Sequence, residues 1–220
     1  MINKWFYVQN SLDVQQEIKK EIKDKNLKTL DIGGSYNFWS YPECLFLADL
    51  IEVKYAPEGF DNSKIKYFPF NIQNEKTWDE LLNFVENNGK FDYIICSHTL
   101  EDIIVPTKLL DLLPKLGKMG YIAIPSKYNE FKKLYNNPYR GNAHHKQIID
   151  IKNDEIIIYP KYSFIEVYNS TNKILEQDQG EELCMFWSEQ IPYKYFAEDI
   201  VFSSDGELIN YFFNQISTNY

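Results

Sequence analysis

The chain has 220 residues, with 23 Lys plus Arg against 32 Asp plus Glu, and so a formal net charge of -9. This excess of acid argues against nucleic acid and anionic membranes as partners, because both bind through clustered basic residues. The length and the hydrophobic fraction of 44% predict a single globular domain. Three widely spaced cysteines, and the lack of a signal-like or membrane-spanning segment, lead us to expect a cytoplasmic protein.

Strand-like and helix-like patterns alternate along the first 126 residues. Apolar residues recur on one face over 11–25, which predicts an amphipathic helix, and the apolar run KTLDIGGS then stops at two glycines. Further strands are expected at 48–56, 64–72, 91–97 and 120–126, and further helices at 77–89 and 107–118. Such alternation predicts a parallel sheet with helices on both faces.

From about residue 127 the pattern changes to antiparallel strands. These are expected in EIIIYPK (155–161), FIEVY (164–168) and EDIVFSSDGELINYFF (198–213), where SDG would form a hairpin turn. The predicted fold is therefore α/β, a three-layer Rossmann-like arrangement with a mainly parallel sheet and an antiparallel C-terminal extension. We expect one domain over 1–220, with a core at 27–126 and an extension at 127–220.

Ligands of such sheets bind at the carboxyl ends of the strands, where the strand order reverses. Asp31, Gly33 and Gly34 follow the first core strand, so a ligand could approach the backbone closely and the carboxylate could accept hydrogen bonds. The segment lacks both the Lys-Ser/Thr ending of a phosphate-binding loop and the GxGxxG spacing of a dinucleotide fold. The same glycines would also suit any tight turn after a strand.

Polar residues also follow the next two strands. An acid about twenty residues after the first loop can bind ribose hydroxyls, and Glu52 occupies that place, with Asp49 as the alternative. Asn71 could bind a purine edge while Ile72 packs on the ring, although Asn is also a routine turn residue.

The segment FDYIICSHTLEDI (91–103) is the most informative. A buried strand opens here into Ser97, His98, Glu101 and Asp102. Acids at the start of a helix are favoured by its dipole, which accounts for Glu101 and Asp102 but not for His98.

A further polar segment, NPYRGNAHHKQI (137–148), follows the last core strand and contains Tyr139, Arg140, His144 and His145. Either histidine could act with His98 and its acidic neighbours as a general base or a metal ligand. Adjacent residues of a strand point to opposite faces, so a joint role needs a turn, which Gly141-Asn142 could supply.

Five motifs together resemble those of class I S-adenosylmethionine-dependent methyltransferases. They are KTLDIGGS, the acid of ADLIEV, FNIQN, FDYIICSHTLEDI and LGKMGYIAIPS, in this order and spacing, within 27–126. The resemblance implies S-adenosylmethionine as cofactor, with Asp31, Gly33 and Gly34 on its methionine side, Glu52 on the ribose, Asn71 and Ile72 at the adenine, and Ser97 and His98 beside the sulfonium. The chain departs from the pattern at Ser35, Asn71 and Asp102, where the family often has Gly, an acid and His.

The sequence thus favours methyl transfer to an oxygen or nitrogen of a small polar molecule or sugar. The catalytic candidates are His98, His145, His144 and Glu101, and the substrate-binding candidates are Arg140, Tyr139 and Trp187. One alternative is a metal-dependent enzyme with ligands such as His98, Asp102 and His144. The other is a methyltransferase-like module without catalysis.

Overall fold

The computed structural model describes residues 3–133, 139–167, 175–176, 178–196 and 204–217. Its main sheet has seven strands in the order β1-β9-β6-β5-β2-β3-β4. The strands are β1 (Lys4–Val8), β2 (Thr29–Ile32), β3 (Phe46–Asp49), β4 (Lys66–Pro69), β5 (Tyr93–Ser97), β6 (Met119–Pro125) and β9 (Glu182–Ser188). Neighbours from β4 to β6 pair in parallel, and β9 pairs antiparallel with β1 and β6. The predicted α/β fold with a mainly parallel sheet is confirmed.

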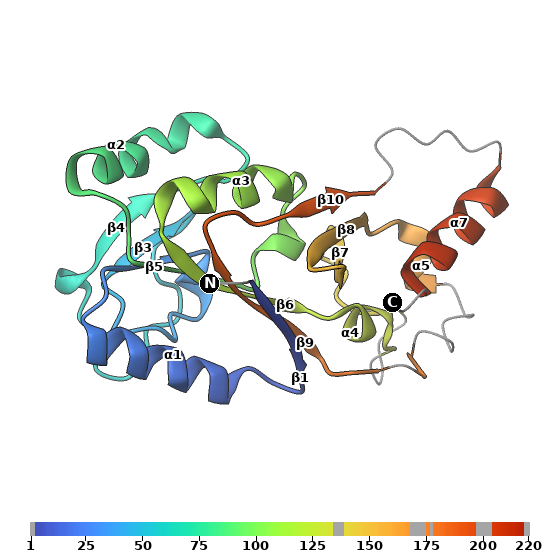
Figure 1. Cartoon of the computed structure of the whole chain (residues 1–220), viewed down its shortest axis with the longest axis horizontal. Coiled ribbons are helices and arrows are strands. Elements are labelled where there is room, and N and C mark those ends of the chain that lie inside the picture. The colour runs from blue at the N-terminus through green and yellow to red at the C-terminus, as the bar shows by residue number, and fades with distance from the viewer. Residues whose placement is uncertain (1–2, 134–138, 168–174, 177, 197–203, 218–220) are drawn as a thin grey trace.

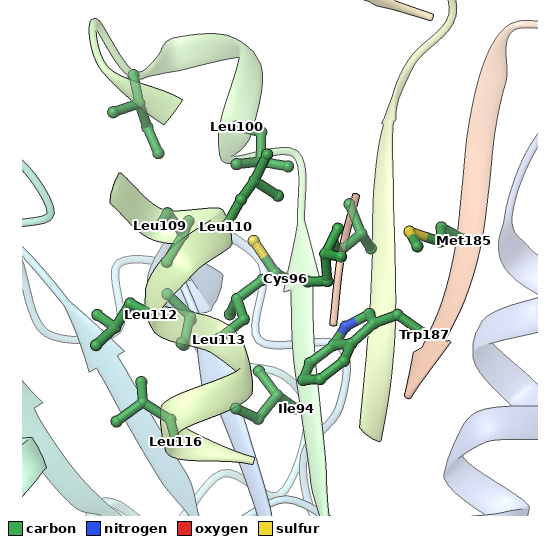
Figure 2. Close-up of a cluster of buried hydrophobic side chains, with 14 of the residues drawn as sticks. Ile94, Cys96, Leu100, Leu109, Leu110, Leu112, Leu113, Leu116, Met185 and Trp187 are labelled. Atoms are coloured by element: carbon green, nitrogen blue, oxygen red, sulfur yellow. The ribbon is translucent and has the colours of Figure 1, made fainter. Parts of the chain in front are cut away.

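Helices cover both faces of this sheet (Figure 1). They are α1 (Leu12–Lys25) on one face, and α2 (Asp79–Asn88) and α3 (Pro106–Leu116) on the other. Strand β5 is buried from Tyr93 to Cys96, because Ile94 and Cys96 pack toward α3 while Tyr93 and Ile95 pack toward α1. Figure 2 shows the α3 side, where leucines of the helix lie against Ile94 and Cys96.

The last third of the chain forms a second, smaller sheet beside the first, in the order β10-β8-β7. Its strands are β7 (Gln147–Lys152), β8 (Glu155–Pro160) and β10 (Tyr193–Tyr195), accompanied by the helices α4 (Lys127–Phe131), α5 (Ser163–Val167) and α7 (Asp205–Ser217). Strands β7 and β8 form an antiparallel hairpin, as predicted for 155–161. Its turn residues Asn153 and Asp154 both have positive φ, as a tight two-residue hairpin requires.

Two predicted strands of this region are helices instead. The strand predicted at 164–168 is wrong, because its first residues belong to α5. A run of five residues is too short to distinguish the period of a strand from that of a helix. The 198–213 hairpin is also wrong in its described part. Leu208, Phe212 and Ile216 recur every four residues in α7, and the hydroxyl of Ser204 accepts a hydrogen bond from the backbone N–H of Glu207 at the helix start. Residues 198–203 lie outside the described residues.

Candidate active site

A cleft of about 1060 Å³ opens at the carboxyl ends of β2 and β5. The strand order reverses between these two strands, since β3 and β4 follow on one side of β2 and β6 follows on the other side of β5. This is where ligands bind in doubly wound sheets. Its walls come from the loop after β2, the end of β3, the loop after β5, the start of β9 and the turn before β7.

Asp31 lies in β2 at the bottom of the cleft and is 1% exposed. Its Oδ2 accepts a hydrogen bond from Ser40 Oγ at 2.6 Å, while its Oδ1 has no partner. Burial raises the pKa of this carboxyl to about 7, the hydrogen bond from Ser40 opposes the rise, and the charge of Asp49 adds to it. The site therefore holds a carboxyl group that would gain from a cationic ligand.

The two glycines after Asp31 are required by packing. Gly33 has φ 79, and a Cβ there would overlap the side chain of Thr99. At Gly34 a Cβ would overlap the carboxylate of Asp31. These glycines therefore let the loop settle between β2 and the segment after β5, which positions Ser35 and the backbone along the cleft.

The acid at the end of β3 is Asp49, the alternative to Glu52. Strand β3 ends at Asp49, so Glu52 lies beyond it, exposed and outside the cleft. Asp49 lines the cleft, and its Oδ2 accepts a hydrogen bond from the backbone N–H of Ser35 at 3.0 Å. This bond ties the glycine loop to β3.

Asn71 and Ile72 do not reach the cleft lining. The Oδ1 atom of Asn71 accepts a hydrogen bond from the backbone N–H of Gln73 at 2.9 Å, as in a common turn, and Ile72 packs against the main core. Both residues therefore lie outside the cleft lining, and their contacts with adenine stay a prediction.

His98 lies between two carboxylates and has φ 51. Its Nδ1 is 3.5 Å from Glu101 Oε1, and its Nε2 is 3.4 Å from Glu182 Oε2. Removal from water lowers the pKa of His98, but the two carboxylates outweigh this and raise it to about 10. The two carboxylates therefore favour the imidazolium form of His98, whereas its predicted role as general base requires the neutral form. Ser97 lies beside it in the cleft wall.

His145 belongs to a buried cluster with Glu130 and Lys161 beside the cleft. Its Nδ1 is 2.5 Å from Glu130 Oε1, and the other oxygen of Glu130 accepts a hydrogen bond from Lys161 Nζ at 2.9 Å. Gly141 has φ 56, and the backbone N–H of His145 donates to the carbonyl of Asn142. The turn predicted at Gly141-Asn142 is thus present, and both His144 and His145 line the cleft.

The three predicted substrate-binding residues lie away from the cleft. Trp187 is 2% exposed and packs in the core under α3, as Figure 2 shows, because β9 turns this side chain toward the sheet's α3 face. Arg140 is buried and donates a hydrogen bond to the backbone carbonyl of Phe131 at 2.9 Å. Tyr139 is exposed and is not part of the lining.

The charged side chains of the lining are acids and histidines. The carboxylates are Asp31, Asp49, Glu101, Asp102 and Glu182, and the histidines are His98, His144 and His145. No Lys or Arg of the described residues contributes to the lining. A cleft of this composition favours cationic ligands and disfavours phosphates.

Two acids of the site were not found from the sequence. Glu182 begins β9, and the apolar run ELCMFWS was the available sign of a strand there. Glu130 sits in the short helix α4, and its contacts with His145 and Lys161 join positions 15 and 31 residues away. No local pattern could have indicated that pairing.

No family model and no curated protein matches this chain. Among solved structures it is similar to the methyltransferase domain of bacterial CtHen1 (10% identity, TM-score 0.43, 80% of this chain and 97% of that one). It is also similar to the N-terminal domain of EvdMO1 with SAH bound (12%, 0.37, 82% and 80%) and to the small RNA methyltransferase HEN1 (12%, 0.41, 83% and 26%). These identities and TM-scores are too low to assign a function to this chain. In the described part of the chain, no helix is long and apolar enough to cross a membrane.

Proposed function

We propose that the protein binds S-adenosylmethionine and transfers its methyl group to a small polar acceptor. The observation that supports this most directly is the carboxylate-rich cleft, without Lys or Arg among the described lining, at the point where the strand order reverses. S-adenosylmethionine has a cationic sulfonium and an ammonium group, which such a cleft favours. A dinucleotide or a nucleoside triphosphate would bring phosphates close to these acids.

The residues present fit this cofactor. Asp31 Oδ1 and Glu101 Oε2 are buried acceptors without a hydrogen-bond partner, and a cationic donor would satisfy them. Asp31 and the glycine loop would hold the methionine part, and Asp49 the ribose hydroxyls. The exposed apolar side chains of Tyr36, Leu50 and Ile51 line the cleft next to Asp49 and would cover the adenine ring.

The bound cofactor would supply an activated methyl group, so the chain has to align the acceptor and remove one proton. His98 suits that task poorly, because its two carboxylate neighbours favour the protonated imidazole. Glu101 faces the cleft with an unpartnered oxygen, and we assign it as the proton acceptor. The imidazole of His145 is the second candidate.

We propose a small polar molecule or a sugar as the acceptor. An RNA acceptor would need basic residues along its path, yet the chain has a net charge of -9 and none of its described Lys or Arg side chains lines the cleft. A small acceptor can be bound by the polar side chains Asn10, Gln15, Asn129 and Asn142, which complete the lining.

Calorimetric titration with S-adenosylmethionine tests this proposal through a matched pair of acids. Asp49→Ala is expected to weaken binding at least about tenfold, or about 1.4 kcal/mol, because it removes the ribose acceptor and the tie to Ser35. Glu52→Ala, three residues further on and exposed, is expected to leave the affinity unchanged. Absence of binding to the unmodified protein at millimolar ligand, or equal loss in both variants, would contradict the proposal.

A further inference from the structure

Three potential metal ligands meet in the lining of the cleft. They are Asp102 at the end of the short 3-10 helix Leu100–Asp102, and His144 and His145 in the turn before β7. One ligand atom of each lies within 4.8 Å of the other two. A hydrogen bond from the backbone N–H of Lys146 to the carbonyl of Glu101, at 2.6 Å, joins the two segments.

The ring of His145 is held in a fixed orientation. Glu130 engages Nδ1, and Lys161 holds Glu130 through its other oxygen, all with side chains no more than 5% exposed. With Nδ1 occupied, Nε2 is the nitrogen left for a ligand. A buried carboxylate behind a histidine is the usual support of a metal-bound imidazole, because it fixes the tautomer and raises the basicity of the free nitrogen.

A further carboxylate lies in the same cleft. Glu101 is 2% exposed, it lines the same cleft, and its Oε2 has no hydrogen-bond partner. Leaving a buried carboxylate oxygen unsatisfied costs free energy, which a cation nearby would recover.

We propose that Asp102, His144 and His145 bind a divalent first-row transition metal ion, with Glu130 positioning His145. Two imidazoles and one carboxylate suit Zn²⁺, Co²⁺, Fe²⁺ or Mn²⁺, whereas Mg²⁺ and Ca²⁺ prefer oxygen ligands alone. Ligand atoms around tetrahedral zinc lie about 3.3 Å apart. His144 Nε2 lies 3.8 Å from Asp102 Oδ1, and the His144 side chain is 69% exposed, so it has room to move toward an ion.

The proposed metal ligands differ from those expected from the sequence, which are His98, Asp102 and His144. His98 is occupied on both nitrogens by Glu101 and Glu182, so His145 takes its place. Three protein ligands leave a position open to water or to an oxygen of the acceptor. With the ion on Nε2 of His145, Glu101 stays the proton acceptor, and metal binding itself does not depend on S-adenosylmethionine.

The test is titration of Co²⁺ into the chelator-treated full chain without a histidine tag. We expect one Co²⁺ per chain, with the visible absorption of a site containing nitrogen ligands, and its displacement by Zn²⁺. His144→Ala and Asp102→Asn, at exposed positions, are expected to weaken Co²⁺ binding at least about tenfold. Glu130→Gln, which keeps the side-chain shape, is expected to weaken it by about 10–100-fold, with folding checked by thermal unfolding.

His98→Asn serves as the matched control, because Asn tolerates the positive φ and the third histidine lies in the same cleft outside the cluster. It is expected to bind Co²⁺ as the unmodified protein does. Failure to bind Co²⁺ stoichiometrically, unchanged binding in His144→Ala and Asp102→Asn, or equal loss in His98→Asn would overturn the metal site. Calorimetry with S-adenosylmethionine on the metal-free protein reports separately on the proposed function.

Discussion

Replacing Glu130 with alanine is expected to lower the free energy of unfolding by about 3–5 kcal/mol. The carboxylate of Glu130 lies between Lys161 and His145, and the side chains of Glu130 and Lys161 are each 1% exposed. Its removal leaves a buried ammonium group without its charge partner, and also a buried imidazole. Urea unfolding at pH 7, followed by circular dichroism, measures the change.

An exposed ion pair provides the control for this variant. Glu75 Oε1 and Lys108 Nζ are 2.6 Å apart, between the 2.5 Å and 2.9 Å of the two Glu130 contacts, but the side chains are 62% and 39% exposed. Glu75→Ala is therefore expected to cost less than about 1 kcal/mol. If both variants lose the same small amount, the buried cluster of Glu130, His145 and Lys161 does not hold α4 to the turn before β7.

Asp31→Asn is expected to change the free energy of unfolding of the ligand-free protein in a pH-dependent way. Its effect above pH 7 should be more stabilising than its effect in acid by up to about 4 kcal/mol. The folded-state pKa of Asp31 lies at about 7, above its ordinary value of 3.8, and each unit corresponds to about 1.4 kcal/mol. The folded state thus binds the proton more tightly than the unfolded state, and the stability of the unmodified protein falls as the pH rises from about 4 through 7. Asparagine has no proton to lose and keeps the hydrogen bond from Ser40.

Unfolding at pH 4, 6 and 8 measures this difference, which should grow with pH. Calorimetry on the same variant should show weaker binding of S-adenosylmethionine, because the carboxylate that costs stability in the empty cleft is the one that binds a cation. Parallel pH profiles for the two proteins would mean that Asp31 is ionised in the folded state at no cost. A gain in stability combined with a loss in affinity is the mark of a residue kept for binding.

The sheet could be predicted from the sequence because its strands are buried on both faces. The runs 91–97 and 120–126 are almost wholly apolar, and β5 and β6 lie there. Strand ends then located Asp31 and His98, because parallel strands bring their carboxyl ends to one edge.

What could not be predicted depends on contacts across the chain. Glu52 was preferred to Asp49 because the apolar run of β3 continues after the strand itself has ended at Asp49. The second carboxylate beside His98 could not be predicted, because Glu182 comes from β9, 84 positions further along the chain, and no local pattern indicates that contact. Trp187 is predicted to bind substrate because its segment has no assigned strand or helix. Without that assignment the sequence does not indicate which face of the sheet the side chain packs on.

The most direct test of the proposed cofactor site is a crystal structure with S-adenosylhomocysteine. The ligand is expected in the cleft between β2 and β5, with its amino group toward Asp31 and its ribose hydroxyls hydrogen-bonded to Asp49, and with Glu52 left in solvent. A saturated crystal with this cleft empty, or with the ribose bound away from Asp49, would contradict it.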